Sequence, residues 1–95
     1  MIKASSININ CKVINVKGLH ARAAAKIVSI SAGFESEIIL SHKNNSVSGL
    51  SLIKLLTLDA PMGSTITITI IGIDANLASS RLMELFKNGF DELND

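Results

Sequence analysis

Apolar and polar residues alternate along two stretches of the chain. The segment STITITII at residues 64–71 places isoleucines on one side and threonines on the other, and Ile7, Ile9, Cys11 and Val13 alternate with polar residues in the same way. A two-residue period is typical of a strand with one buried and one exposed face. We therefore expect strands near both ends of the chain.

Two further strands and a tight turn are predicted in the middle of the chain. Residues 34–40 form an apolar-rich run, HKNNS at residues 42–46 has the composition of a hairpin turn, and a short strand should follow at residues 46–49. Gly72 ends the strongest strand.

Three segments have helical character. Ala21 to Ala32 contains strong helix formers and stops before Gly33, and residues 51–58 form a shorter helix with Ser51 as its N-cap. A final helix should begin at Asp74 as its cap. Its apolar stripe consists of Ala78, Leu82, Leu85 and Leu93.

The order strand, helix, strand, strand, helix, strand, helix predicts a two-layer α/β sandwich in a single domain over residues 1–95. Helices should cover one face of the sheet and water the other. The order of elements does not determine the order of strands in the sheet, and ferredoxin-like domains share most of it.

Composition narrows the class of protein. The chain has 95 residues, 47% of them hydrophobic, with no Trp or Tyr, so the core should be aliphatic. The formal net charge of +1 and the scarcity of aromatic side chains argue against a nucleic-acid partner. Cys11 is the single cysteine and excludes an internal disulfide, and the opening residues contain no long apolar run. We therefore expect a cytoplasmic domain with no signal peptide and no membrane span.

His20 is the residue most suited to chemistry. It lies where a turn at Gly18 leads into the alanine-rich helix, and the positive end of that helix disfavours an imidazolium and favours an anion. A neutral ring has a lone pair for nucleophilic attack, and Arg22 adds a planar cation matched to phosphate oxygens. These residues suit a histidine that accepts and passes on a phosphoryl group. The alternative is that His20 is a helix cap beside a surface arginine.

A metal site is not indicated, and we expect no cofactor. The second histidine, His42, falls in the predicted turn, where it should be solvated, and neither histidine pairs with Cys11 at a ligand spacing.

The short helix SLIKLLTL carries more apolar residues than one buried face needs. Some of them should be exposed, and an exposed apolar patch usually marks a partner surface. The alternative is that the final helix or a loop covers them. Ser51 is either a simple cap or also a phosphorylation site that the helix dipole would favour.

The segment Gly18-Leu19-His20-Ala21-Arg22 resembles the active-site segment of HPr, the histidine-containing phosphocarrier family of the phosphoenolpyruvate-dependent phosphotransferase system. Ser51 lies at the spacing of the regulatory serine of that family, followed by LIKLLTL. Gly63 before the alternating strand, GIDA at residues 72–75 and FDE at residues 90–92 also match in register. The resemblance covers roughly residues 6 to 93.

This resemblance implies an α+β open-faced sandwich with a four-stranded antiparallel sheet in the order 1-4-2-3 and three helices on one face. It implies that His20 takes a phosphoryl group from enzyme I and passes it to a IIA protein, with Arg22 stabilising the phosphate. Ser51 would be the target of HPr kinase/phosphorylase where the organism has one. The docking surface would comprise Ala21, Ala25, Leu52, Ile53 and Leu56.

The protein would then be a monomeric carrier, with no catalytic turnover of its own and with neither nucleic acid nor membrane as a partner. Ala23 replaces the usual proline after the arginine, and Lys54 stands where glycine is common. The GLHARAAAK segment is similar to the alphaproteobacterial, nitrogen-type branch, so the pathway and the phosphoryl acceptor stay open. Two alternatives are a ferredoxin-like module that binds a small effector and an HPr-like docking regulator without transfer.

Overall fold

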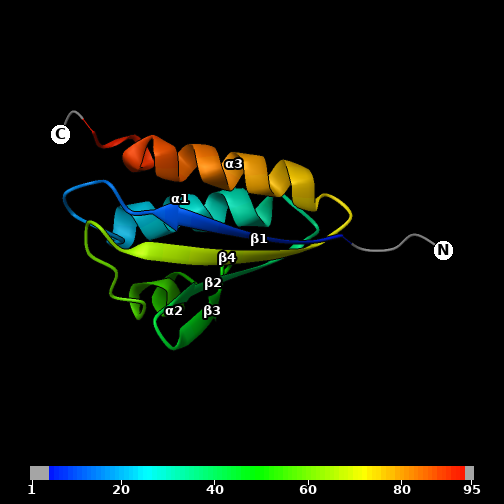
Figure 1. The fold of residues 1–95 in the computed structure, drawn as a ribbon, viewed down its shortest axis with the longest axis horizontal. Helices are drawn as coiled ribbons and strands as arrows, with labels where there is room; N and C mark the ends of the chain where they lie inside the picture. Colours follow the sequence, from blue (N-terminus) through cyan, green and yellow to red (C-terminus); the bar gives the residue numbers. More distant parts are fainter. Residues whose placement is uncertain (1–4, 94–95) are drawn as a thin grey trace.

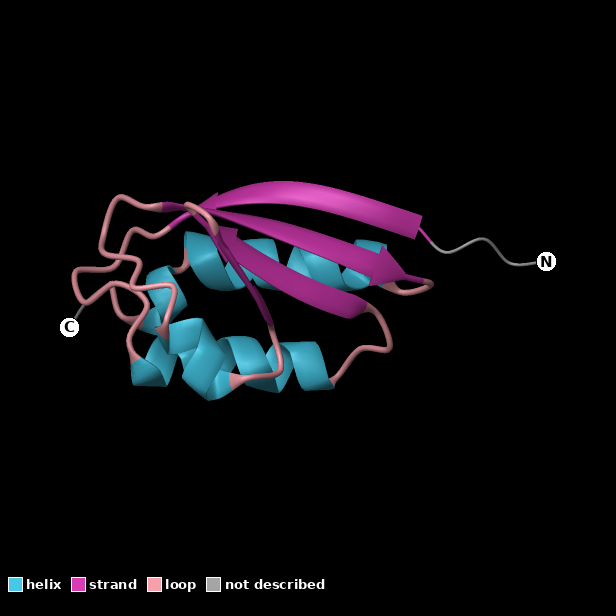
Figure 2. Ribbon diagram, turned by 90° about the horizontal axis from the view of Figure 1, so that it is seen from below, coloured by secondary structure: helices cyan, strands magenta, loops and turns pink. Residues whose placement is uncertain are grey.

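A four-stranded antiparallel sheet carries three α-helices on one of its faces in the computed structural model, which describes residues 5–93 (Figures 1 and 2). The strands are β1 (Ser5–Lys12), β2 (Glu37–His42), β3 (Asn45–Ser48) and β4 (Thr65–Gly72). The helices are α1 (Ala21–Ala32), α2 (Leu52–Leu56) and α3 (Ala75–Lys87), followed by a short 3₁₀ helix, η1 (Gly89–Asp91). In Figure 2 the helices lie together below the sheet, and its other face is open.

The strand order β1-β4-β2-β3 is the order implied by the resemblance to HPr. The first strand lies at an edge of the sheet, whereas a ferredoxin-like domain has it inside. β4 is central, since Ile68 lies opposite Ile9 of β1 and opposite Leu40 of β2. The ferredoxin-like alternative is therefore wrong.

The alternation in β4 separates the two faces as predicted. Ile66, Ile68 and Ile70 are fully buried beneath the helices. On the open face, the hydroxyl groups of Thr67 and Thr69 donate hydrogen bonds to the side-chain oxygens of Asn10 and Asn8, at 2.9 and 2.7 Å. The threonines thus link β4 to β1 where water has access.

The start of β2 and the role of Asp74 differ from the prediction. The carboxylate of Asp74 accepts hydrogen bonds from the backbone N–H groups of Glu35 and Ser36 and from the Ser36 hydroxyl. These bonds hold residues 34–36 in a loop, so β2 begins at Glu37 and not at residue 34. Asp74 does occupy the N-cap position of α3, but its side chain makes no capping hydrogen bond there.

Two predictions about single side chains are wrong. Leu93 lies beyond α3 and is 57% exposed, whereas Ala78, Leu82 and Leu85 of the predicted stripe are buried. His42 is the last residue of β2, and its Nδ1 forms a 2.9 Å hydrogen bond with the carbonyl oxygen of Leu58, so it is not a solvated turn residue. The chain leaves α3 earlier than its apolar pattern indicates, whereas β2 continues into the first residue of the predicted turn.

The turn before α1 depends on glycine. Gly18 has φ of 67°, and a Cβ added there would lie 2.6 Å from the carbonyl oxygen of Ala60. That carbonyl also accepts the N–H of Leu19 at 2.9 Å. The close approach of the two loops at this end of the molecule therefore sets the position at which α1 begins.

Replacement of Gly18 by alanine should lower the stability of the protein through both strain and collision. We expect Gly63→Ala, where φ is 95° but no atom lies within 4 Å of the added Cβ, to cost only the conformational strain, about 1–2 kcal/mol. Gly18→Ala should cost about 1–3 kcal/mol more because Ala60 must move. Denaturant unfolding of the two variants measures the difference, and equal losses would contradict the proposed contact.

Candidate functional site

His20 occupies the N-cap position of α1 without capping the helix through its side chain. Its backbone is extended, with φ of −90° and ψ of −178°, and its carbonyl oxygen accepts the N–H of Ala24 at 2.9 Å. The imidazole makes no capping hydrogen bond and remains 26% exposed. His20 therefore does hold the N-cap position, as the cap alternative expects, but its imidazole does not cap the first helical turn.

A carboxylate that the sequence analysis did not assign to the site contacts the imidazole. Glu92 Oε2 lies 2.5 Å from His20 Nε2 and also accepts from Arg22, at 3.1 Å from Nε and 3.0 Å from Nη2. Its other oxygen accepts from Asn15 Nδ2 at 2.8 Å. His20 and Arg22, predicted as a pair, are thus joined through Glu92.

The C-terminal segment reaches His20 because the chain reverses after α3. Phe90 is fully buried with φ of 56°, and its ring packs edge-on against Phe86 at a centroid distance of 4.8 Å. Lys26 of α1 holds the same turn by donating to the Phe90 carbonyl oxygen at 2.9 Å and to Asp91 at 3.1 Å. In Figure 1 the red C-terminal end accordingly lies beside the start of α1.

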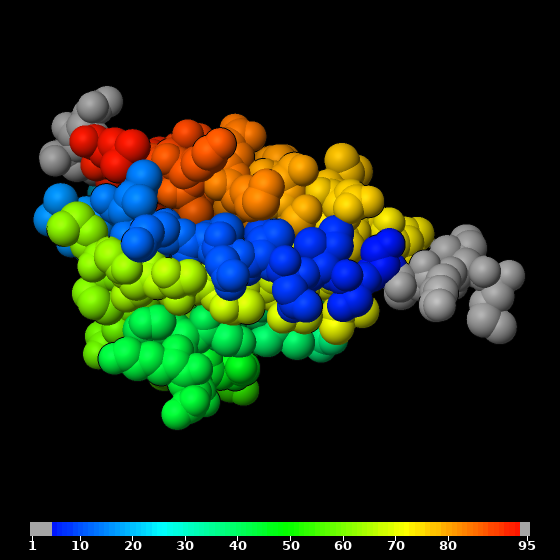
Figure 3. All heavy atoms as spheres, viewed as in Figure 1, coloured from blue at the N-terminus to red at the C-terminus, as the bar shows by residue number. Residues whose placement is uncertain are grey.

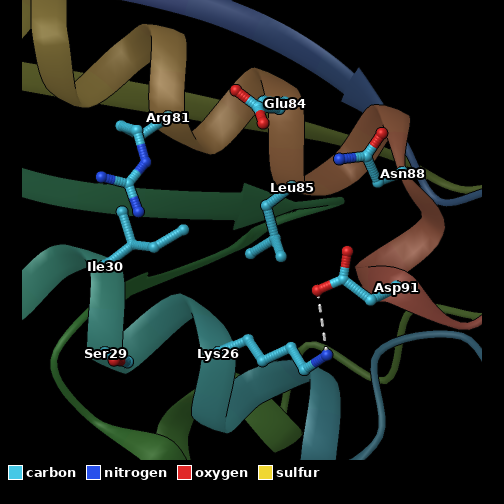
Figure 4. A pocket seen from close by; sticks show the side chains of 8 residues that line it. All are labelled: Lys26, Ser29, Ile30, Arg81, Glu84, Leu85, Asn88 and Asp91. Atoms are coloured by element: carbon cyan, nitrogen blue, oxygen red, sulfur yellow. Dashed lines mark hydrogen bonds and ion pairs between the residues drawn. The ribbon is translucent and has the colours of Figure 1, made fainter.

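A hollow of about 300 Å³ lies next to this turn, between α1 and α3 (Figure 4). Its polar lining combines two cations, Lys26 and Arg81, with two carboxylates, Glu84 and Asp91. Figure 4 shows Lys26 pointing across the hollow toward Asp91. The balanced charges and the Lys26–Asp91 pair indicate an anchor for the C-terminal turn rather than a site for a charged ligand.

Asn15 ties the same carboxylate to the loop before α1. Its side chain is buried, and Nδ2 donates to the Gly18 carbonyl oxygen at 2.8 Å as well as to Glu92. The position of Glu92 is therefore coupled to the glycine turn that precedes His20.

The donors around Glu92 keep its carboxyl group ionised. Burial alone would raise its pKa, but the hydrogen bonds from Asn15, His20 and Arg22 and the charge of His20 outweigh burial and lower the pKa to about 2. An ionised carboxylate only accepts hydrogen bonds, so His20 Nε2 carries a proton. In the neutral ring, Nδ1 then holds the lone pair, and no described residue forms a hydrogen bond with it. A ring oriented in this way can act as a nucleophile through Nδ1.

The apolar residues of α2 divide between the core and the surface. The helix ends at Leu56, earlier than the predicted residue 58. Leu55 is fully buried, and Leu58 beyond the helix is 4% exposed, whereas Leu52, Ile53 and Leu56 are 39%, 73% and 37% exposed. The prediction that some of them remain exposed is confirmed. Ala21 and Ala25 are also exposed on α1, which packs against α2. We call these five exposed residues, Ala21, Ala25, Leu52, Ile53 and Leu56, the docking surface, after the role expected from the sequence.

Ser51 is the N-cap of α2, as predicted. Its Oγ accepts the backbone N–H of Lys54 at 3.3 Å. The side chain is half-buried and stands next to the exposed residues of the docking surface.

Across residues 5–93, no three His, Cys, Asp or Glu side chains are grouped so that they could hold a metal ion. The helices in the same range are too short or too polar to cross a membrane.

The fold defines the class of protein as a small α+β open-faced sandwich, and comparisons with known proteins identify the family. A family model described as "PTS HPr component phosphorylation site" matches residues 7–88. Phosphocarrier protein HPr of Xylella fastidiosa is 41% identical over 84% of this chain and 90% of its own length. Phosphocarrier protein NPr of Shewanella violacea is 38% identical over 84% of this chain and 88% of its own length.

A solved structure supports the same assignment. HPr from Thermoanaerobacter tengcongensis superposes with a TM-score of 0.86 at 28% identity, covering 90% of this chain and 97% of that chain. The protein therefore belongs to the HPr family of phosphotransferase-system phosphocarriers. The name NPr among its relatives agrees with the similarity of GLHARAAAK to the nitrogen-type branch.

Removal of the Glu92 charge should make the free energy of unfolding depend less on pH in the acidic range. The folded-state pKa of about 2 lies below the ordinary value of 4.5, so the stabilisation is present above 4.5 and is lost as pH falls toward 2. We expect Glu92→Gln to melt several degrees below the parent protein near neutral pH, and this difference to shrink between those two pH values. Thermal melts across that range measure it.

Glu84→Gln removes an exposed carboxylate of α3 and controls for the change in net charge. A deficit of Glu92→Gln that stays constant down to the lower pH would show that its partners do not hold the carboxylate ionised.

Proposed function

We propose that the protein accepts a phosphoryl group on His20 Nδ1 from phospho-enzyme I and transfers it to a IIA protein. The single observation that carries the proposal is the orientation of His20 at the N-cap position of α1, with Nε2 on Glu92 and with Nδ1 making no hydrogen bond to a described residue. Membership of the phosphocarrier family supports the reaction class. In this role the protein is a stoichiometric carrier and not an enzyme.

The bonds and charges of the proposed transfer can be followed at the imidazole ring. The Nδ1 lone pair attacks phosphorus, an N–P bond forms, and the bond from phosphorus to the donor breaks, with its electron pair leaving on the donor. The ring then carries a positive charge that Glu92 balances through the proton on Nε2. Return of the phosphoryl group to an acceptor reverses these changes.

Arg22 is proposed to stabilise the phosphate. Its guanidinium binds Glu92 through Nε and Nη2, while the side chain is 53% exposed. Rotation of such an exposed side chain can direct donors to phosphate oxygens, for which the planar guanidinium fork is suited. Glu92 therefore acts as a positioning residue for both His20 and Arg22.

The docking surface is proposed to bind both enzyme I and the IIA protein. Its residues are apolar and exposed, and α1, whose first residue follows His20, contributes Ala21 and Ala25 to it. A phosphate on Ser51, added by HPr kinase/phosphorylase, would place negative charge beside this surface and weaken docking. The chain is expected to act as a monomer in the cytoplasm, as one domain.

Phosphorylation on a nitrogen of His20 can be tested directly. Incubation with phosphoenolpyruvate and enzyme I should add one phosphate, detected by intact-mass spectrometry, and the label should be lost in acid and retained in base, as expected for an N–P bond. His20→Ala should abolish the gain. His42→Ala, which removes the second histidine of the chain, should not.

A phosphate that survives in His20→Ala would refute the assignment of His20. A protein that binds enzyme I but gains no phosphate would instead be a docking regulator without transfer.

Two substitutions on α2 can distinguish a role in docking from a role in core packing. Ile53→Glu should leave the melting temperature nearly unchanged, because Ile53 is 73% exposed, and should slow phosphoryl acceptance about tenfold or more by placing a charge in a desolvated contact. Leu55→Ala should show the opposite pattern, with a loss of about 2–5 kcal/mol of stability and a normal rate below its melting temperature. A normal transfer rate for Ile53→Glu at limiting concentrations would exclude this surface.

A further inference from the structure

β1 presents a free edge of unpaired backbone groups. The N–H and C=O of Val13 bond to Ser64 and Gly63 at 2.8 and 2.7 Å, so they point toward the β4 side. Groups of successive residues in an antiparallel strand point alternately to its two sides. Those of Ser6, Asn8, Asn10 and Lys12 therefore point away from β4, and nothing in the described chain lies beyond them in the sheet.

The two edges of the sheet differ in length. β3 at the opposite edge has 4 residues, which leaves little room for another strand, whereas β1 has 8 residues in continuous register with β4. β1 contains no proline and one charged residue, Lys12. Apart from Lys12 at its end, it thus lacks the charges and prolines that usually prevent pairing at an edge. Figure 3 shows β1 in blue along the surface, next to α3 in orange.

An apolar hollow of about 390 Å³ adjoins this edge, between the end of β1 and α3. Ile14, Met83 and Phe86 form its apolar lining, and Ile14 and Met83 are 40% and 43% exposed. Ile7 and Ile9 of β1 are half-buried, although their partners in β4 are fully buried. An additional strand would lie about 4.8 Å outside β1, and its inward side chains would cover this apolar flank.

The charged side chains that line this hollow are all positive. Lys12 and Lys87 line it together with Asn10 and Cys11, and no carboxylate does. Neither ammonium group has a hydrogen bond or ion pair within residues 5–93. The site therefore favours a ligand that combines backbone donors and acceptors, apolar side chains and negative charge.

We propose that the free edge of β1 and the hollow beside α3 bind an extended acidic peptide segment of a partner protein. The segment adds a fifth strand to the sheet, places alternate apolar side chains against Ile14 and Met83, and pairs an acidic residue with Lys12 or Lys87. This surface is separate from His20 and the docking surface, so the carrier could be held by one protein while it exchanges phosphate with others.

The probe is a synthetic peptide with the length of β1, alternating valine and threonine, with aspartates at both ends. Titration into isotope-labelled protein, followed by amide NMR spectra, should give saturable shifts at Ser6, Asn8, Asn10 and Lys12 and slower amide exchange there. The same peptide with lysines at its ends should bind at least tenfold more weakly. A version with alternate backbone amides methylated, on the side that faces β1, should not bind.

Matched variants separate backbone pairing from charge. Asn10→Pro removes an outward N–H, and proline is tolerated at a free edge. Asn10→Ala loses the same side chain but keeps that N–H. The first should abolish peptide binding and the second preserve it. Lys12→Glu with Lys87→Glu should reverse the preference between the acidic and basic peptides, whereas Lys43→Glu in the β2–β3 turn should not.

Absence of saturable shifts at millimolar acidic peptide would overturn the proposal. A second result would also overturn it: the protein self-associates with rising concentration, Asn10→Pro abolishes this association, and the peptide does not compete with it. The edge would then bind a second copy of the chain. Phosphorylation of His20 is measured separately in the same samples, so failure of peptide binding does not bear on the carrier function.

Discussion

The site depends on a single carboxylate that three residues from a distant part of the chain satisfy. Glu92 accepts from Asn15 in the loop after β1 and from His20 and Arg22 at the start of α1, although it lies 77, 72 and 70 residues away from them in sequence. Its side chain is only 4% exposed, so the carboxylate is stable there only when these donors are present. The glycine turn, the first helix and the C-terminal turn must therefore be in place together.

In the proposed transfer, the Glu92 carboxylate also competes with the phosphate for the hydrogen-bond donors of Arg22. Before phosphorylation, Glu92 occupies the donors of Arg22 and balances the charge around His20. A phosphoryl group on Nδ1 brings a second anion to the same helix N-terminus, which favours it electrostatically, but the two anions repel each other. Release of Arg22 from Glu92 to the phosphate lowers that repulsion. Under the proposed function, Glu92 therefore balances the charge of the ring, while its repulsion of the phosphate limits the stability of the phosphorylated state, as a carrier between two partners requires.

Most of the fold can be predicted from the sequence because local residue patterns determine most of its helices and strands. The two-residue period of β4 and the alanine-rich run of α1 each specify an element and its buried face, and α1 has the predicted bounds. Glu92 could not be found in this way, because its role arises from the reversal at Phe90, where a non-glycine residue takes φ of 56° to bury its ring. The available signal was Gly89 followed by a phenylalanine and two acids, directly after a helix. Asp74 shows the same limit. An acidic residue at a helix start predicts a side-chain cap, but the carboxylate of Asp74 binds the loop before β2 instead.

The two proposed binding surfaces lie where the two-layer fold leaves apolar side chains uncovered. Three helices cover four strands incompletely, and α2 is too short to bury both of its sides, so Leu52, Ile53 and Leu56 remain near the end of the molecule that carries His20. α3 lies over β1, but no element flanks β1 on its outer side, so Ile14 and Met83 remain exposed at that edge. One exposed surface lies beside His20 and the other beside unpaired backbone, so a partner at the proposed edge site does not displace one at the proposed docking surface.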